Sequence, residues 1–416
     1  MTQREDEAHR ALETAARQSY GKLIACLAAG TRDIALAEDA LSEAFAAALA
    51  AWTDQGCPAR PEGWLLTVAR RKMIDQYRGR RRDELAAEQW RILVEDAATE
   101  TAEADLPDRR LALMFACAHP AIEASVRAPL MLQTVVGLDA KQIASGFLMS
   151  PSAMGKRLVR AKEKIRRAAI PFRIPERTEL PARLDAVLEA IYAAFTEGWS
   201  DPAGTDAQRR GLTEEALFLA RVAVDLLPKE PEALGLLALL LHLEARRRAR
   251  RDGQGDYVPF ADQDTALWDA PMIAEAEAVL QRAGAMGAPG RYQLEAALQS
   301  AHVHRRLRGG APWAEVLRLY DALFAITGSP VVAINRAMAL AELEGPTRAL
   351  EALSEVAADA RLVEYQPYWA VRADLLARAG ERAEARHAYE VAIGLQRDPA
   401  VRRFLQGRLS SLQEDS

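Results

Sequence analysis

The stretch LDAKQIASGFLMSPSAMGKRLVRAKEKIRR, residues 138–167, predicts two short helices joined by a tight turn. Asp139 can cap the first helix, and Gln142 stands three residues later, where its side chain can reach back to the cap. Ser150 followed by Pro151 is a typical start for the second helix, because a serine hydroxyl accepts from free backbone N–H groups and proline fits the first helical position.

The second predicted helix is amphipathic and basic. Its apolar stripe consists of Met154, Leu158, Ala161 and Ile165, and the polar residues away from that stripe include Ser152, Lys156, Arg157, Arg160 and Lys164. A compact helix pair of this kind places its second helix in the major groove of DNA, where lysine and arginine contact guanine edges and phosphates. A basic helix face by itself is often a solvated surface, but the caps, the turn and the stripe together favour a helix-turn-helix that binds DNA.

The charged residues of the chain are unevenly distributed. The formal net charge of −5 at pH 7 by itself argues against nucleic-acid binding. However, residues 60–82 hold eight basic and two acidic residues, and residues 151–172 hold seven basic and one acidic. Between them, residues 83–108 hold nine acidic residues and one arginine. Two basic helices separated by an acidic linker indicate a nucleic-acid-binding protein, although the net charge of the whole chain is negative.

The other basic helix is expected after the loop TDQGCPARP, residues 53–61. Pro61 can open this helix, which carries the run GWLLTVARRKMIDQYRGRRR. Interleaved aromatic and basic side chains suit a separated DNA strand, because unstacked bases stack on aromatic rings and phosphates pair with cations. Taken alone, Trp64 and Tyr77 are more often core residues than DNA contacts.

The composition favours an all-α protein. Alanine, leucine, arginine and glutamate dominate, whereas valine, isoleucine and threonine are sparse, a balance typical of helices. Three prolines, Pro171, Pro175 and Pro181, mark a boundary, after which helical patterns recur between proline and glycine residues. We therefore expect helical domains at residues 1–82, 108–172 and 176–416, with an acidic linker at residues 83–107.

The C-terminal part carries an internal repeat. Trp369, Ala373, Ala385, Tyr389 and Ala392 follow one another at offsets of 4, 12, 4 and 3, and the same offsets relate Ala333, Ala337, Ala349, Leu353 and Val356. The pattern resembles a tetratricopeptide repeat (TPR), in which small residues let paired helices approach closely. Alanine is common enough here for single matches to arise by chance, but two copies with identical offsets favour helical repeats.

The order of these segments resembles that of the sigma-70 family. The run DIALAEDALSEAFAAALAAW, residues 33–52, looks like the family's helix that binds core RNA polymerase. The run PEGWLLTVARRKMIDQYRGRRR, residues 61–82, looks like its segment that melts and reads the promoter −10 element, and the helix-turn-helix looks like its −35-reading domain. A chain with only these two sigma domains resembles the extracytoplasmic-function (ECF) type. Residues 175–410, with ARRRARRDGQGDYVPFADQDTALWD and SPVVAINRAMALAE, resemble the TPR-like extension of one ECF subgroup.

The resemblance assigns roles to individual residues. It implies that core polymerase is bound by Asp33, Glu38, Asp39, Glu43 and Phe45. It implies that the −10 DNA is bound by Arg60, Trp64, Arg70, Lys72, Gln76 and Arg80, with a flipped base held by the loop at residues 53–60. It implies that the −35 duplex is read by Ser152, Lys156, Arg157 and Arg160. The function that follows is an alternative sigma factor, with the β and β′ subunits of core RNA polymerase and promoter DNA as partners.

No catalytic, cofactor or metal motif is recognisable in the sequence. His302 and His304 are two positions apart, which is not the spacing of a helical metal site, and the acidic run at residues 252–264 does not match a calcium loop. We therefore expect no enzyme activity, no cofactor and no metal. Three isolated cysteines, a charged N-terminus and short apolar runs predict a cytoplasmic protein without a membrane segment.

Two alternative functions stay open at this stage. One is a helix-turn-helix DNA-binding regulator that never contacts polymerase, and the other is a TPR scaffold with a vestigial helix-turn-helix. We further hypothesise that the C-terminal part binds an unidentified protein or small-molecule ligand and regulates the sigma domains.

Overall fold

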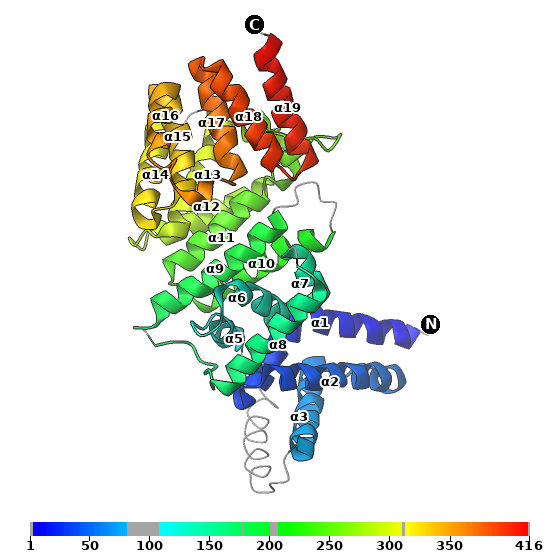
Figure 1. Ribbon diagram of the computed structural model, residues 1–416. Coiled ribbons are helices and arrows are strands. Elements are labelled where there is room, and N and C mark those ends of the chain that lie inside the picture. The colour runs from blue at the N-terminus through cyan, green and yellow to red at the C-terminus, as the bar shows by residue number, and fades with distance from the viewer. Residues whose placement is uncertain are drawn as a thin grey trace. The chain divides into compact units, whose positions relative to one another are not determined.

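The computed structural model describes residues 3–80, 108–147, 149–176, 178–199, 207–309 and 313–414. Within these ranges helices are the regular secondary structure, and the one β pairing is an isolated bridge between Arg251 and Tyr257 (Figure 1). This confirms the predicted all-α class. The chain divides into two compact units, Met1–Leu226 and Leu227–Ser416. The acidic linker expected at residues 83–107 lies outside the described residues.

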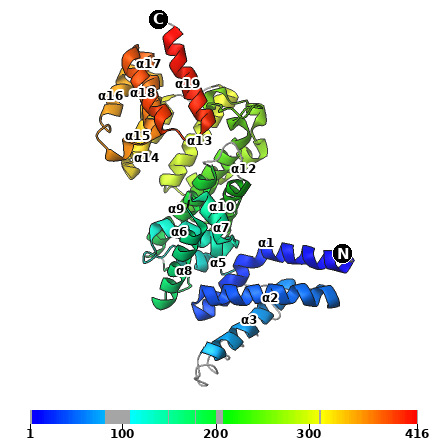
Figure 2. The same ribbon diagram turned by 45° about the vertical axis from the view of Figure 1, so that its right-hand side comes forward.

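Three long helices form the N-terminal part of the first unit: α1 (Gln3–Thr31), α2 (Ile34–Gln55) and α3 (Pro61–Arg80). α2 packs against both α1 and α3 (Figures 1 and 2). Asp33 caps α2, since its carboxylate accepts from the backbone N–H of Leu36 at 3.1 Å. The indole of Trp52 is buried near the end of α2, and Trp64 of α3 meets it edge-on with ring centroids 5.5 Å apart.

The predicted helix-turn-helix forms with both of its expected caps. It follows α5 (Arg110–Cys117), α6 (Ala124–Met131) and the π-helix η1 (Leu132–Val136), and consists of α7 (Ala140–Gly146) and α8 (Pro151–Arg167). Asp139 accepts from the N–H of Gln142 at 2.7 Å, and the Gln142 side chain accepts from the N–H of Asp139 at 2.9 Å. The Ser150 hydroxyl accepts from the N–H of Ala153 at 3.2 Å. The apolar stripe of α8, from Met154 to Ile165, is buried as predicted.

Two more helices, α9 (Leu180–Trp199) and α10 (Ala207–Leu226), belong to the same compact unit. α9 packs on α5 and α6, and α10 packs on α5 and α7. The Arg183 guanidinium of α9 donates to the carbonyl of Phe115 at 2.5 Å, and that of Arg110 lies 5.2 Å from the ring centre of Phe218. The compact units therefore divide at Leu226, whereas the sequence predicted a domain boundary between residues 172 and 176.

The second unit is a succession of packed helices. They are α11 (Pro231–Glu244), α12 (Ala270–Gly284), α13 (Arg291–Arg308), α14 (Trp313–Thr327), α15 (Pro330–Glu344), α16 (Pro346–Ser354), α17 (Gln366–Ala379), α18 (Arg382–Leu395) and α19 (Pro399–Glu414). Short 3₁₀ helices interrupt them at Arg247–Arg250, Phe260–Asp262, Thr265–Leu267 and Ala360–Leu362. From α13 onward each helix packs against the next, and Figure 2 shows α17 and α18 side by side.

Small residues allow the close approaches in this unit. A Cβ atom added to Gly235 of α11 would lie 2.6 Å from the backbone nitrogen of Gln293 in α13. The five residues of the repeat that starts at Trp369 belong to one hydrophobic cluster between α17, α18 and α19, with Ala373, Ala385 and Ala392 fully buried. The spacing seen in the sequence therefore marks residues that pack together.

Candidate polymerase and nucleic-acid interface

Two of the acidic residues predicted to bind polymerase, Asp39 and Glu43, are exposed on α2. Glu43 is engaged within the chain, because Lys72 Nζ lies 3.1 Å from its Oε2 and Gln76 Nε2 donates to its Oε1 at 2.9 Å. These hydrogen bonds, with that from Lys72 the stronger, lower the pKa of Glu43. Glu43, predicted to bind polymerase, thus contacts Lys72 and Gln76 of the neighbouring helix, which are predicted to bind DNA. Among the described residues, none forms an ion pair with Asp39. The ring of Phe45 is half-buried.

Glu38 of α2 faces the helix-turn-helix. Its carboxylate forms an ion pair with Lys162 of α8, and the two side chains are only 18% and 8% exposed. Burial raises the pKa of Glu38, and the charge and hydrogen bond of Lys162 oppose that rise. Its second oxygen, Oε1, is buried without a hydrogen-bond partner among the described residues. The pair therefore holds a carboxylate predicted to bind polymerase inside a contact between α2 and α8.

Three further close contacts connect the two predicted sigma domains within the first unit. Asp33 lies 4.0 Å from Arg166 of α8. A Cβ atom added to Gly21 of α1 would lie 2.1 Å from the carbonyl oxygen of Val135 in η1. Gly137, with φ +90°, lies against the ring of Tyr20. The predicted polymerase-binding helix and the predicted −35-reading helix are consequently packed on each other in this state.

The residues predicted for −10 DNA are divided between surface and interior. Arg60 is exposed in the loop before α3, and Trp64 is half-buried against Trp52. Arg70 is half-buried, and burial lowers the pKa of its guanidinium. The backbone of Arg80 ends α3, and its side chain lies outside the described residues. The structure therefore gathers Lys72 and Gln76, two of the residues predicted for −10 DNA, around Glu43.

The residues predicted for −35 DNA share the open side of α8, with one difference. Ser152, Lys156 and Arg160 are exposed. Arg157 is half-buried and donates to Glu123 at 2.7 Å and to the hydroxyl of Ser125 at 2.6 Å. The first three side chains are open to solvent, although Arg160 Nε donates to the carbonyl of Lys156, whereas Arg157 is held by Glu123 and Ser125 at the start of α6.

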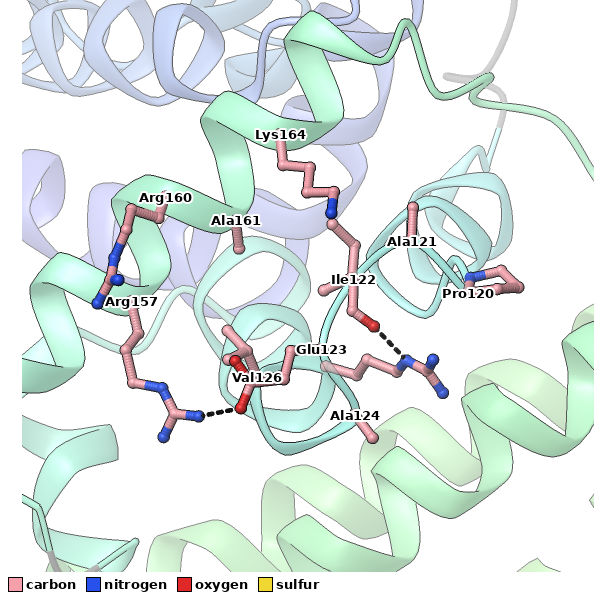
Figure 3. A pocket seen from close by; sticks show the side chains of 11 residues that line it. Pro120, Ala121, Ile122, Glu123, Ala124, Val126, Arg157, Arg160, Ala161 and Lys164 are labelled. Atoms are coloured by element: carbon pink, nitrogen blue, oxygen red, sulfur yellow. Dashed lines mark hydrogen bonds and ion pairs between the residues drawn. The ribbon is translucent and has the colours of Figure 1, made fainter.

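A pocket of about 450 Å³ opens between α8 and the segment that leads into α6 (Figure 3). The basic side chains that line it are Arg127, Arg157, Arg160 and Lys164, and Glu123 is its one carboxylate. Figure 3 shows Lys164 across the pocket from the bond between Arg157 and Glu123, with Arg160 on the same side as Arg157. The hydrogen bond from Ser125, followed by the charge of Arg157, lowers the pKa of Glu123.

The sequence did not identify four of these residues as site residues: Glu123, Arg127, Lys162 and Lys164. Lys162 pairs with a residue 124 positions away, and Arg157 with one 34 positions away. Helical spacing relates only residues within one helix, so it carries no signal for either pair. The one available hint was Lys162 itself, a cation beside the apolar stripe of α8 that needs a partner when buried.

Neither a metal site nor a membrane span is found in the described part of the chain. No three histidine, cysteine, aspartate or glutamate side chains among those residues are placed to hold a metal ion. None of the described helices combines the length and the apolar character required to cross a bilayer.

Comparisons with known proteins match two parts of the chain to families. Residues 16–83 match the family model of Sigma-70 region 2, and residues 183–284 match a family of unknown function, DUF6596. The uncharacterized protein R00370 of Rhizobium meliloti (strain 1021) is 37% identical over 407 residues, which cover 97% of this chain and 95% of that protein. No solved structure matches the chain. The first match spans most of α1–α3 and supports a sigma-factor-like role in transcription initiation.

Proposed function

We propose, on the premise that the chain belongs to one family with protein R00370 of Rhizobium meliloti and carries Sigma-70 region 2, that it is an alternative sigma factor of the ECF type. The observation that carries the proposal is the combination of that region with a capped, basic helix-turn-helix in one compact unit. In this role α2 binds core RNA polymerase, α3 with its preceding loop captures the −10 strand, and α8 reads the −35 duplex.

The packed state of the first unit adds a condition to this mechanism. Glu38 can contact polymerase only after its ion pair with Lys162 breaks, since both side chains are largely buried in that pair. The −10 and −35 elements of a promoter are also separate sites on DNA, so α8 needs to leave its contact with α2 for α3 and α8 to reach one element each. Binding to core polymerase is the step that supplies the free energy for this separation.

Run-off transcription tests the proposed function directly. The full-length chain is added to purified bacterial core RNA polymerase with fragmented genomic DNA of its own species, and the 5′ ends of the transcripts are mapped. We expect discrete start sites that need both the chain and the core enzyme. Transcripts that are identical with and without the chain would contradict the proposal.

We also propose that the second unit is TPR-like and regulates the sigma domains. The support is the shared hydrophobic cluster of the repeat that starts at Trp369, and the packing of four residues of the other copy, Ala337, Ala349, Leu353 and Val356, in a second cluster. Stacked helix pairs of this kind offer an extended binding surface. The ligand of that surface is an unidentified protein or small molecule.

Deleting residues 227–416 tests the regulatory role. The cut follows α10, because a cut at residue 176 would strip α9 and α10 from the buried faces of α5, α6 and α7. We expect promoter activity in cells to change by about fivefold or more, the size of a typical coupling between sites. Circular dichroism and limited proteolysis of the purified fragment provide the folding control. Equal activity of a folded fragment and the full chain would contradict regulation.

A further inference from the structure

The pocket between α6 and α8 lies beside the surface that is proposed to enter the major groove. Arg157, Arg160 and Lys164 are spaced by three and four residues, so they share one side of α8. That side borders the face that carries Ser152 and Lys156, both exposed. When a helix occupies the major groove, the phosphates of the two strands run along its flanks. The pocket therefore lies where a backbone phosphate would pass.

The charges of the pocket favour an anion. Four cationic side chains line it against one carboxylate, that of Glu123. Arg127 is partly engaged, since its Nε donates to the carbonyl of Ile122 at 3.1 Å, and Arg160 Nε donates to the carbonyl of Lys156 at 3.3 Å. The side-chain amine of Lys164 has no ion pair or hydrogen bond within the part of the chain that the structure describes, and it points into the pocket (Figure 3).

Glu123 is the more exposed partner of the ion pair that occupies the pocket. Its side chain is 69% exposed, whereas that of Arg157, which it binds, is 24% exposed. Arg157 is further fixed by Ser125 and by the sulfur of Met149, 3.4 Å from its Nη1. An incoming phosphate can thus displace the exposed carboxylate into solvent, at the loss of its hydrogen bond from Ser125, while the guanidinium keeps its position.

We propose that this pocket binds a backbone phosphate of duplex DNA through Arg157, Arg160 and Lys164, and that Glu123 competes with the phosphate for Arg157. The inference rests on the proposed function of α8 and deepens it. The competition weakens binding to duplex of any sequence, so stable binding requires the base contacts of the exposed face as well. Glu123 is in this sense a residue that sets specificity without touching a base.

The experiment measures binding of the full chain to a fluorescent duplex of random sequence at several potassium chloride concentrations. Glu123→Gln keeps a hydrogen-bond acceptor for Arg157 but removes the competing charge, and we expect it to raise affinity at low salt by about fivefold. Lys164→Ala should lower affinity and reduce the slope of log K against log salt by about 0.9, the value for one lost phosphate contact. Arg318→Ala, an exposed arginine of α14, is the control with the same charge change and should alter neither quantity.

The possible outcomes separate this inference from the proposed function. Duplex binding that is unaffected by Glu123→Gln and by Lys164→Ala would overturn the phosphate pocket, and run-off transcription would still decide the sigma-factor role. Tight binding of free inorganic pyrophosphate that excludes the duplex would assign the pocket to a small anion and would also overturn the inference. A shallower salt slope for Lys164→Ala with tighter binding of Glu123→Gln would establish it.

Discussion

Asp39→Lys should reduce run-off transcription with core polymerase by at least about tenfold. Asp39 is exposed on α2, and the chain matches Sigma-70 region 2 over this helix. If Asp39 contacts polymerase as proposed, reversing its charge places like charges together, which costs several kcal/mol, and a tenfold loss corresponds to about 1.4 kcal/mol. The fold should be unaffected, because no described residue forms an ion pair with this carboxylate. The measurement is transcript yield together with direct binding of the chain to core polymerase.

Glu189→Lys is the matched control for this prediction. Glu189 is exposed on α9 and undergoes the same charge reversal outside the proposed polymerase surface. Both variants should bind a random duplex equally well. Equal transcription from the two variants would favour a DNA-binding regulator that does not use polymerase. Asp39 is a sharper test than Glu43, whose replacement would also break the contacts with Lys72 and Gln76.

Lys162→Met should destabilise the first unit by about 3 kcal/mol at pH 7, because it leaves the buried carboxylate of Glu38 without its partner. The loss should depend on pH in a defined direction. Burial raises the pKa of Glu38 above its ordinary value of 4.5, and without Lys162 nothing on α8 opposes that rise. At a pH between 4.5 and the raised pKa, Glu38 is protonated in the folded chain but has lost its proton in the unfolded chain. The destabilisation is therefore greatest at neutral pH and shrinks as the pH falls toward 4.5.

Urea unfolding of the full chain at pH 7 and pH 5 measures this effect. Lys164→Met is the control, since it removes an exposed lysine from the same helix. The double variant Lys162→Met with Glu38→Gln should regain much of the lost stability, because no charge then stays buried. A loss that is the same at both pH values would mean that Glu38 reaches water in the variant, and it would contradict a buried pair.

Much of the local structure was predictable from the sequence. The caps at Asp139 and Ser150 depend on residues within three positions, and the buried stripe of α8 depends on a period that one helix sets by itself. The five residues spaced from Trp369 were equally recognisable as residues that pack together, because close-packed helices need small residues at fixed offsets. The all-α class follows from the composition, and the exposed positions of Ser152, Lys156 and Arg160 follow from the helical period of α8, so both could be predicted from the sequence.

Contacts between distant segments were decided only by the tertiary structure. Glu38 meets Lys162, and Glu123 meets Arg157, because packing brings together helices whose sequences carry no mark of each other. The packing of α9 and α10 on α5–α7 follows from the apolar faces that those helices leave to be buried, which no proline-rich boundary reveals. The sequence by itself thus determined which helices form and which side of each is basic. The tertiary structure decided which of those charges are open to a partner and which are already paired, because pairing depends on distance in space.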